Sequence, residues 1–115
     1  MKRLALLALL SLVWNSHAAD GAADAGLQAV VELGRINGTA LACGRLDVAN
    51  KAKALMLLRP PKTRRHGEAY EEATTAVFNE LTADRSACPD DVILSLRFEA
   101  ADIKLDAAFP AQPGR

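Results

Sequence analysis

Apolar residues recur with helical spacing in four segments of the chain, and these segments predict four helices. The first begins at Leu27, the second covers residues 47–59, the third covers residues 68–83, and the fourth follows Cys88. Only residues 92–98 have some strand character, and the proline and aspartates before them favour a helix. The sequence therefore predicts an all-α protein, a small bundle of three or four helices. The residues expected to face its core are Leu27, Val30, Val31 and Leu33 in the first helix, Val48, Ala52, Leu55, Met56 and Leu58 in the second, Tyr70, Ala73, Val77, Phe78 and Leu81 in the third, and Val92, Ile93, Leu96, Ala100, Ile103 and Ala107 in the fourth.

Small residues follow the first apolar stripe. Gly34, Gly38 and Ala42 stand four residues apart, so they share one stripe if the first helix runs on. In one interpretation they let another helix approach closely. In the other, Asn37 and Gly38 form a turn that ends the helix. We favour a continuous helix, because apolar residues beyond Gly38 keep the helical spacing.

Prolines and carboxylates mark the expected helix ends. A proline pair after residue 59 stops the second helix. Pro89 is expected at the first position of the fourth helix, with Asp90 and Asp91 in its first turn. Glu68 and the two glutamates that follow it are expected in the first turn of the third helix, where the helix dipole favours carboxylates.

The amino terminus has the parts of a cleavable secretory signal peptide. Lys2 and Arg3 precede an uncharged apolar core at residues 4–14, and small residues stand at the two positions that a signal peptidase reads. We expect cleavage after Ala18, with Ala19 as the alternative. The apolar core is shorter than the roughly 20 residues that a membrane-spanning helix needs. The sequence thus predicts a periplasmic or secreted protein with no stable membrane span after cleavage.

Composition is typical of one globular domain, with half of the residues apolar and equal numbers of basic and acidic side chains, 14 of each. The chain is expected to divide into a signal peptide at 1–18, a single helical domain at 19–110 and a flexible tail at 111–115. A nucleic-acid-binding protein would usually be strongly basic, so no nucleic-acid partner is predicted.

Cys43 and Cys88 are the only cysteines, and in an oxidising compartment an even number of cysteines indicates a disulfide. Closing a loop of this length is worth about 4 kcal/mol in the chain-entropy model. The alternatives are a metal pair and a catalytic thiol. Two distant cysteines without a C-x-x-C motif match neither a zinc site nor a redox pair.

No motif of known chemistry is present. The sequence lacks a nucleophile elbow, a phosphate-binding loop, a zinc-protease motif, a haem-attachment motif and a calcium-binding loop. His66, the one histidine beyond the predicted signal peptide, is expected to be a solvated loop residue. We therefore predict no catalytic residue, no metal, no cofactor and no enzymatic activity.

The connection at residues 59–66 is the one surface feature that suggests a partner. Arg59, Lys62, Arg64 and Arg65 are candidates to bind an acidic protein or an anionic component of the cell envelope. The alternative is a solvated connection, partly neutralised by the glutamates that follow. Charge runs of this length are commonly of that second kind.

In layout the chain resembles the small periplasmic acid-stress chaperones, which are also helical, carry a signal peptide and have one disulfide whose second cysteine starts a late helix. The resemblance rests on chain length, the separation of the cysteines and the position of Cys88. It implies a holdase that exposes apolar helix faces in acid, where protonation of the carboxylates leaves mutually repelling positive charges. The sequence itself favours a non-catalytic binding or accessory protein of the cell envelope, with an acid-responsive chaperone as the alternative.

Overall fold

The computed structural model describes residues 17–110, and for residues 17–20, 22 and 23 it describes the backbone alone. The predicted signal peptide, except for its last two residues, and the predicted tail at 111–115 lie outside the described residues. The described part contains helices and no strand, which confirms the predicted all-α bundle. Its elements are α1 (His17–Ala42), α2 (Leu46–Leu58), α3 (Arg64–Ala83), the short 3₁₀ helix η1 (Arg85–Ala87) and α4 (Asp91–Ala108).

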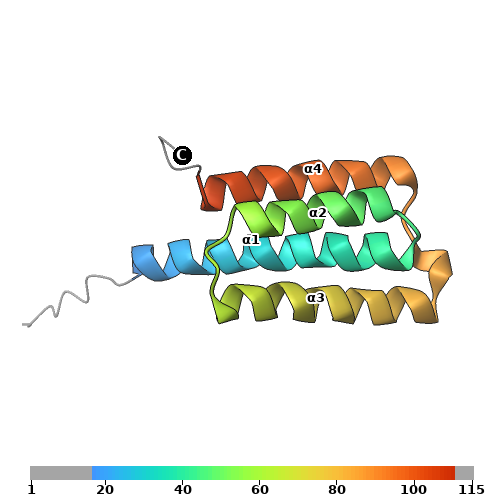
Figure 1. Ribbon diagram of the computed structural model, residues 1–115, viewed down its shortest axis with the longest axis horizontal. Helices are drawn as coiled ribbons and strands as arrows, with labels where there is room; N and C mark the ends of the chain where they lie inside the picture. Colours follow the sequence, from blue (N-terminus) through green and yellow to red (C-terminus); the bar gives the residue numbers. More distant parts are fainter. Residues whose placement is uncertain (1–16, 111–115) are drawn as a thin grey trace, which may run out of the picture.

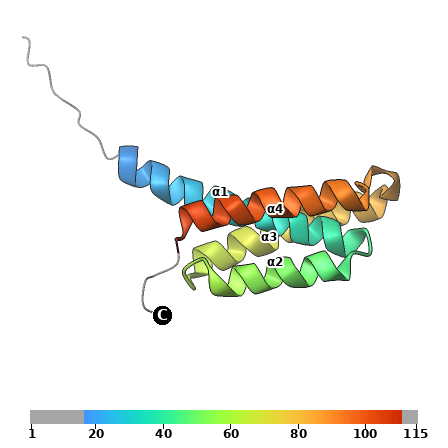
Figure 2. The ribbon, with the colours of Figure 1, turned by 90° about the horizontal axis from the view of Figure 1, so that it is seen from above.

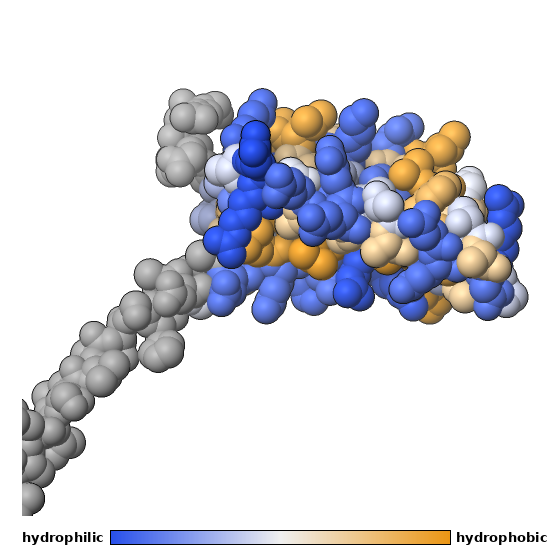
Figure 3. All heavy atoms as spheres, turned by 90° about the horizontal axis from the view of Figure 1, so that it is seen from below, coloured by the Kyte–Doolittle hydropathy of each residue, from blue (hydrophilic) through white to orange (hydrophobic). Residues whose placement is uncertain are grey.

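Helix α1 is the central element of the bundle. It contacts each of the other three α-helices, with α3 on one side and with α2 and α4 on another (Figures 1 and 2). Helices α2 and α4 touch each other only slightly, and α3 packs mainly against α1. The face that α3 turns to solvent is largely hydrophilic (Figure 3). None of the described helices has the length and apolar character needed to cross a membrane.

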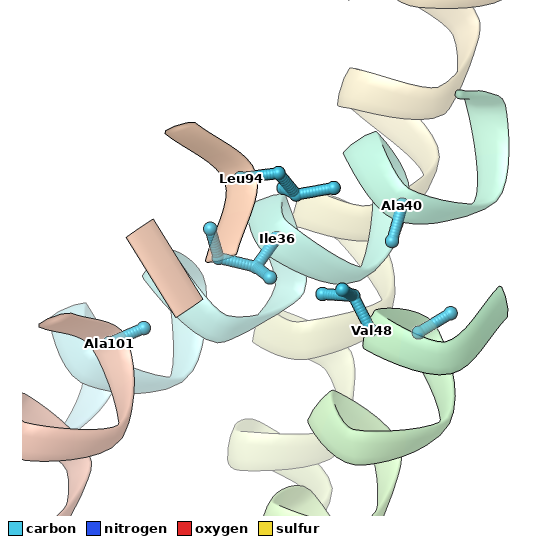
Figure 4. Close-up of a cluster of buried hydrophobic side chains, with 6 residues drawn as sticks. Ile36, Ala40, Val48, Leu94 and Ala101 are labelled. Carbon is cyan, nitrogen blue, oxygen red and sulfur yellow. The ribbon is translucent and has the colours of Figure 1, made fainter. Parts of the chain in front are cut away.

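The core lies where α1, α2 and α4 meet, and much of it is alanine. One cluster joins Ile36 and Ala40 to residues of α2 and α4 (Figure 4). A second cluster, around Val30 and Leu33, is closed by partly buried side chains that include Tyr70 of α3. Alanines bring helix axes close together but bury little surface each, so the apolar contribution to stability is modest. The buried residues of the two clusters are Ala29, Val30, Leu33, Ile36, Ala40, Val48, Ala49, Ala52, Leu94, Ala101 and Leu105.

Helix α1 continues through Gly38, which confirms the first interpretation of the small-residue stripe. The two glycines lie directly against α3: a Cβ atom at Gly34 would stand 2.5 Å from the backbone oxygen of Tyr70, and one at Gly38 would stand 2.4 Å from that of Thr74. Polar groups join the same contact. The Thr74 hydroxyl shares its one hydrogen between the Tyr70 carbonyl of α3 at 2.8 Å and the Gly34 carbonyl of α1 at 3.1 Å, and it accepts from the Asn37 amide at 3.2 Å.

Helix α3 begins at Arg64, four residues earlier than predicted. Thr63 is its N-cap, and the Thr63 hydroxyl accepts a hydrogen bond from the His66 backbone N–H. A threonine at this position satisfies one of the free amides of the first turn. The prediction that Glu68 and its neighbours occupy the first turn was therefore wrong.

Helix α4 begins at Asp91, with Asp90 as the N-cap. The Asp90 carboxylate accepts from the Ile93 backbone N–H at 2.9 Å. Pro89 lies before the cap and outside the helix, so its predicted place at the first helical position was wrong. The expected acidic start of the helix is confirmed.

Helix α4 buries a different face from the one predicted. The predicted stripe is largely exposed: Val92 is 69%, Leu96 55% and Ile103 71% accessible. The buried residues are instead Leu94, Ala101 and Leu105, which lie on the opposite side of the helix, with Phe98 packed beside them. Two apolar stripes run along this helix, and only one of them contacts α1. The predicted core role of Leu58 was also wrong, since Leu58 is 77% accessible at the end of α2.

The predicted disulfide is present between Cys43 and Cys88, whose Cα atoms are 5.8 Å apart. Cys43 directly follows α1, and Gly44 beside it has a positive φ of 77°, a backbone conformation that glycine adopts without strain. Cys88 precedes the cap of α4. The bond therefore ties the end of α1 to the start of α4.

The close contact between α1 and α3 predicts the effect of added methyl groups. Gly38→Ala should destabilise the protein by about 1–3 kcal/mol, because the new Cβ overlaps the α3 backbone and the helices must separate. Gly67→Ala is the matched control, since nothing lies within 4 Å of a Cβ there. It should stabilise by about 0.5–1 kcal/mol through helix propensity. Urea unfolding followed by circular dichroism measures both, and equal effects would contradict this account of the contact.

Tyr70 offers a second test of the core. The Tyr70 hydroxyl is buried without a hydrogen-bond partner among the described residues, and burial raises the pKa of Tyr70 to about 12. Removing an unpaired buried hydroxyl costs little free energy. Tyr70→Phe should therefore lower the free energy of unfolding by less than about 1 kcal/mol, or raise it. Tyr70 is the only tyrosine in the chain, so phenolate absorbance reports its titration directly. A native-state midpoint near 10 would show that the hydroxyl reaches solvent.

Candidate functional site

The four predicted partner-binding cations do not form one group in the structure. Lys62, Arg64 and Arg65 are exposed and close in sequence, Lys62 just before the Thr63 N-cap and the two arginines in the first turn of α3, and we call these three the basic edge. Arg59 is the C-cap of α2 and pairs with Asp106 of α4. Arg59 therefore fastens α2 to α4, and three of the four candidates remain free for a partner.

The basic edge carries unpaired positive charge. The ion pairs of the described residues do not include Lys62, Arg64 or Arg65. The glutamates that follow form no direct ion pair with these cations, and the alternative of a solvated connection stays open. Strongly hydrophilic side chains are visible at the end of the molecule where α3 begins (Figure 3).

The placement of Arg64 and Arg65 works against the stability of α3. They are the first two residues of the helix, where the positive end of the helix dipole disfavours cations, by about 0.3–1 kcal/mol for each charge. The structure describes no acidic residue in that first turn. The two arginines thus lower the stability of α3. Residues that lower local stability are typical of functional positions.

Side-chain packing supports the start of α3, which carries the basic edge. His66, predicted to be a solvated loop residue, is half-buried in the first turn of α3, and its imidazole Nδ1 lies 2.5 Å from the Thr63 hydroxyl. The ring meets Phe109 edge to face at 5.6 Å between centroids. Phe109 also covers Gly26 of α1, where a Cβ would stand 2.8 Å from the phenyl ring. The end of α4, the start of α3 and α1 thus form one packed end, and the cations project from it.

A second set of charges lies at the opposite end, beside the disulfide. The Arg45 guanidinium donates to both carboxylate oxygens of Asp47, at 3.1 and 3.0 Å, and contacts Asp91 of α4 at 2.6 Å. These hydrogen bonds lower the pKa of Asp47 to about 2. The two links Arg45–Asp91 and Arg59–Asp106 hold the opposite ends of α2 against α4, where few apolar contacts join the two helices.

One side of α1 has no helix packed over it. A hollow of about 700 Å³ follows this side between α1 and α4, and its lining includes Leu27, Val31, Arg35 and Lys104. The lining mixes apolar side chains with scattered single charges.

The outer face of α4 is a further surface that the sequence analysis assigned to the core. Its exposed apolar residues form a stripe the length of the helix, and two of them, Ala100 and Ala107, also line the hollows between α4 and α1. The sequence could not have assigned this stripe correctly, because the buried and exposed stripes have the same helical spacing. The stripe consists of Val92, Ile93, Leu96, Ala100, Ile103 and Ala107.

The remaining predicted positions are those of signal cleavage, which stays a prediction. Ala18 and Ala19, the predicted cleavage positions, lie in the first turn of α1. No group of three or more histidine, cysteine, aspartate or glutamate side chains among the described residues is arranged to hold a metal ion. Comparison of the chain with protein-family models, curated proteins and solved structures gives no match.

The Arg45–Asp47 contact predicts a pH dependence. A carboxyl group whose pKa is lowered in the folded state stabilises the protein above its unfolded pKa of about 4, and this stabilisation is lost as the pH falls towards 2. Asp47→Asn should therefore be less stable than the wild type at pH 7 and equal to it near pH 2, as measured by urea unfolding. Glu71→Gln removes an exposed carboxylate that forms none of these ion pairs and should show no such convergence. A wild-type advantage that persists at pH 2 would contradict the assignment.

Proposed function

We propose that this chain is an exported, non-catalytic protein of the cell envelope that binds an anionic partner through the basic edge. The observation that carries the proposal is the set of three exposed cations without ion-pair partners at the start of α3, on a packed end of the molecule. Cations that project from a rigid element lose less entropy on binding than cations on a mobile loop. Arginine also presents paired N–H groups that match carboxylates and phosphates.

Export is supported by two features of the chain. The first is the signal-like amino terminus, with Lys2 and Arg3 before an apolar core. The second is the Cys43–Cys88 disulfide, a bond that forms and persists in oxidising compartments. Both agree with a periplasmic or secreted protein.

The experiment that tests the proposal is affinity capture from envelope extract with two charge-matched variants. Arg64→Ala with Arg65→Ala removes two charges from the basic edge, whereas Lys51→Ala with Arg85→Ala removes two exposed charges elsewhere. We expect the wild type and the second variant to retain a stoichiometric anionic partner at pH 7, and the first variant to lose it. Salt of about 0.5 M should release the partner, because it screens exposed charges.

Equal retention by the two variants would contradict the proposal and would make the basic edge a solvated connection. The extract contains both acidic proteins and anionic polymers, and mass spectrometry together with phosphate and sugar analysis tells which is retained. Unfolding curves of both variants exclude a loss of folding as the cause.

A second candidate function, an acid-activated holdase, is supported by the way α2 is attached to α4. Two exposed arginine–aspartate pairs add to the apolar packing that joins α2 to α4, and acid in general replaces such attractions with repulsion among the remaining positive charges. Release of α2 would expose the alanine-rich core clusters. Under this function, many unrelated proteins would be retained only at acid pH, and Arg64→Ala with Arg65→Ala would not change their retention.

A further inference from the structure

The outer face of α4 has the repeat of a coiled-coil seam. Ile93, Leu96, Ala100, Ile103 and Ala107 alternate in steps of three and four, which is the heptad spacing of positions a and d. All five are exposed. The seam covers 15 residues, or about 21 Å of helix. The opposite face of α4 is already occupied, because Leu94, Phe98, Ala101 and Leu105 pack towards α1.

Nothing among the described residues covers this seam. Helix α4 lies on the outside of the bundle, and Figure 2 looks down on its outer side. Exposed leucine and isoleucine side chains arranged in one contiguous line are typical of a contact surface. The two alanines at position a let a second helix approach closely.

The charges that flank the seam identify its partner. On one side, at positions e, stand the cations Arg97 and Lys104; on the other, at positions g, stand Glu99 and Asp106. All four are exposed. In a parallel pair of such helices, each g residue faces the e residue five positions further along the other helix. Glu99 of each chain then faces Lys104 of the other, and this pair occurs twice by symmetry.

An antiparallel pairing brings like charges together. There g faces g and e faces e, so acidic residues meet acidic residues and basic residues meet basic ones. Neither Glu99 nor Lys104 belongs to the ion pairs of the described residues, so both are available to a second chain. We infer that two copies of this chain associate through α4 in a parallel, two-fold symmetric pair, with Glu99 of each copy against Lys104 of the other.

The seam is short and two of its five residues are alanine, so the buried area falls below the roughly 1,600 Å² of a standard interface. The dimer should therefore dissociate on dilution. Like charges in place of the Glu99–Lys104 pairs should raise the dissociation constant of the dimer roughly tenfold, because two pairs change from attraction to repulsion.

Sedimentation equilibrium on the purified, disulfide-bonded protein up to about 1 mM tests the inference. Glu99→Lys and Lys104→Glu should each weaken self-association, whereas an equimolar mixture of the two variants should dimerise like the wild type. In the mixed dimer both cross-chain pairs again join a lysine to a glutamate, one with the wild-type sign and one with reversed sign. Lys53→Glu, an equal charge change at an exposed position of α2, is the control and should have no effect.

Three outcomes would overturn the inference. The first is a wild-type protein that stays monomeric at every concentration, which leaves the seam to some other occupant. The second is a dimer that the α4 variants do not change. The third is a stronger dimer with Glu99→Lys, because in the parallel pair this change sets two cations against each other and can only weaken the association. Each outcome is independent of the capture experiment, so the failure of this inference and the failure of the proposed function are distinguishable.

Discussion

The absence of side chains at Gly34 and Gly38 fixes the distance between α1 and α3, and the arrangement of the bundle depends on that distance. With the α3 backbone this close, Thr74 reaches the Gly34 carbonyl and Asn37 reaches Thr74, so a contact poor in apolar volume gains hydrogen bonds. Helix α3 packs mainly against α1 and contacts α2 and α4 little. Its start therefore stands at the edge of the bundle, where its cations are exposed to solvent.

The small residues of the core have a second consequence. Alanines bury little surface, so a domain of this size gains from covalent and electrostatic links between its helices. The disulfide joins the end of α1 to the start of α4, and Arg45 joins α2 to α4 at the same end. At the other end Arg59 and Phe109 join α4 to the rest of the molecule. The links at the two ends lie on either side of the alanine-rich core clusters.

Most of the fold could be predicted from the sequence, because helix propensity, prolines and the two cysteines agree with one another. The face of α4 could not. Leu94, Phe98, Ala101 and Leu105 have the same spacing as Ile93, Leu96, Ala100, Ile103 and Ala107, and nothing local distinguishes a stripe that contacts α1 from one that does not. Arg59 illustrates the same limit at the candidate site: in sequence it belongs to the basic run, and only the three-dimensional fold brings Asp106 to it.

The parallel direction of the inferred dimer matters for the proposed function. The end of α4 and the start of α3 lie at the same end of the molecule, where Phe109 meets His66 (Figure 1). A parallel pair therefore places both basic edges at one end of the dimer, whereas an antiparallel pair would place them at opposite ends. Two neighbouring cation clusters bind an extended anionic partner more tightly than one, since the second contact is intramolecular. They also repel each other, and an anionic partner removes that repulsion. Partner binding and dimerisation should then strengthen each other by the same factor, as linkage requires.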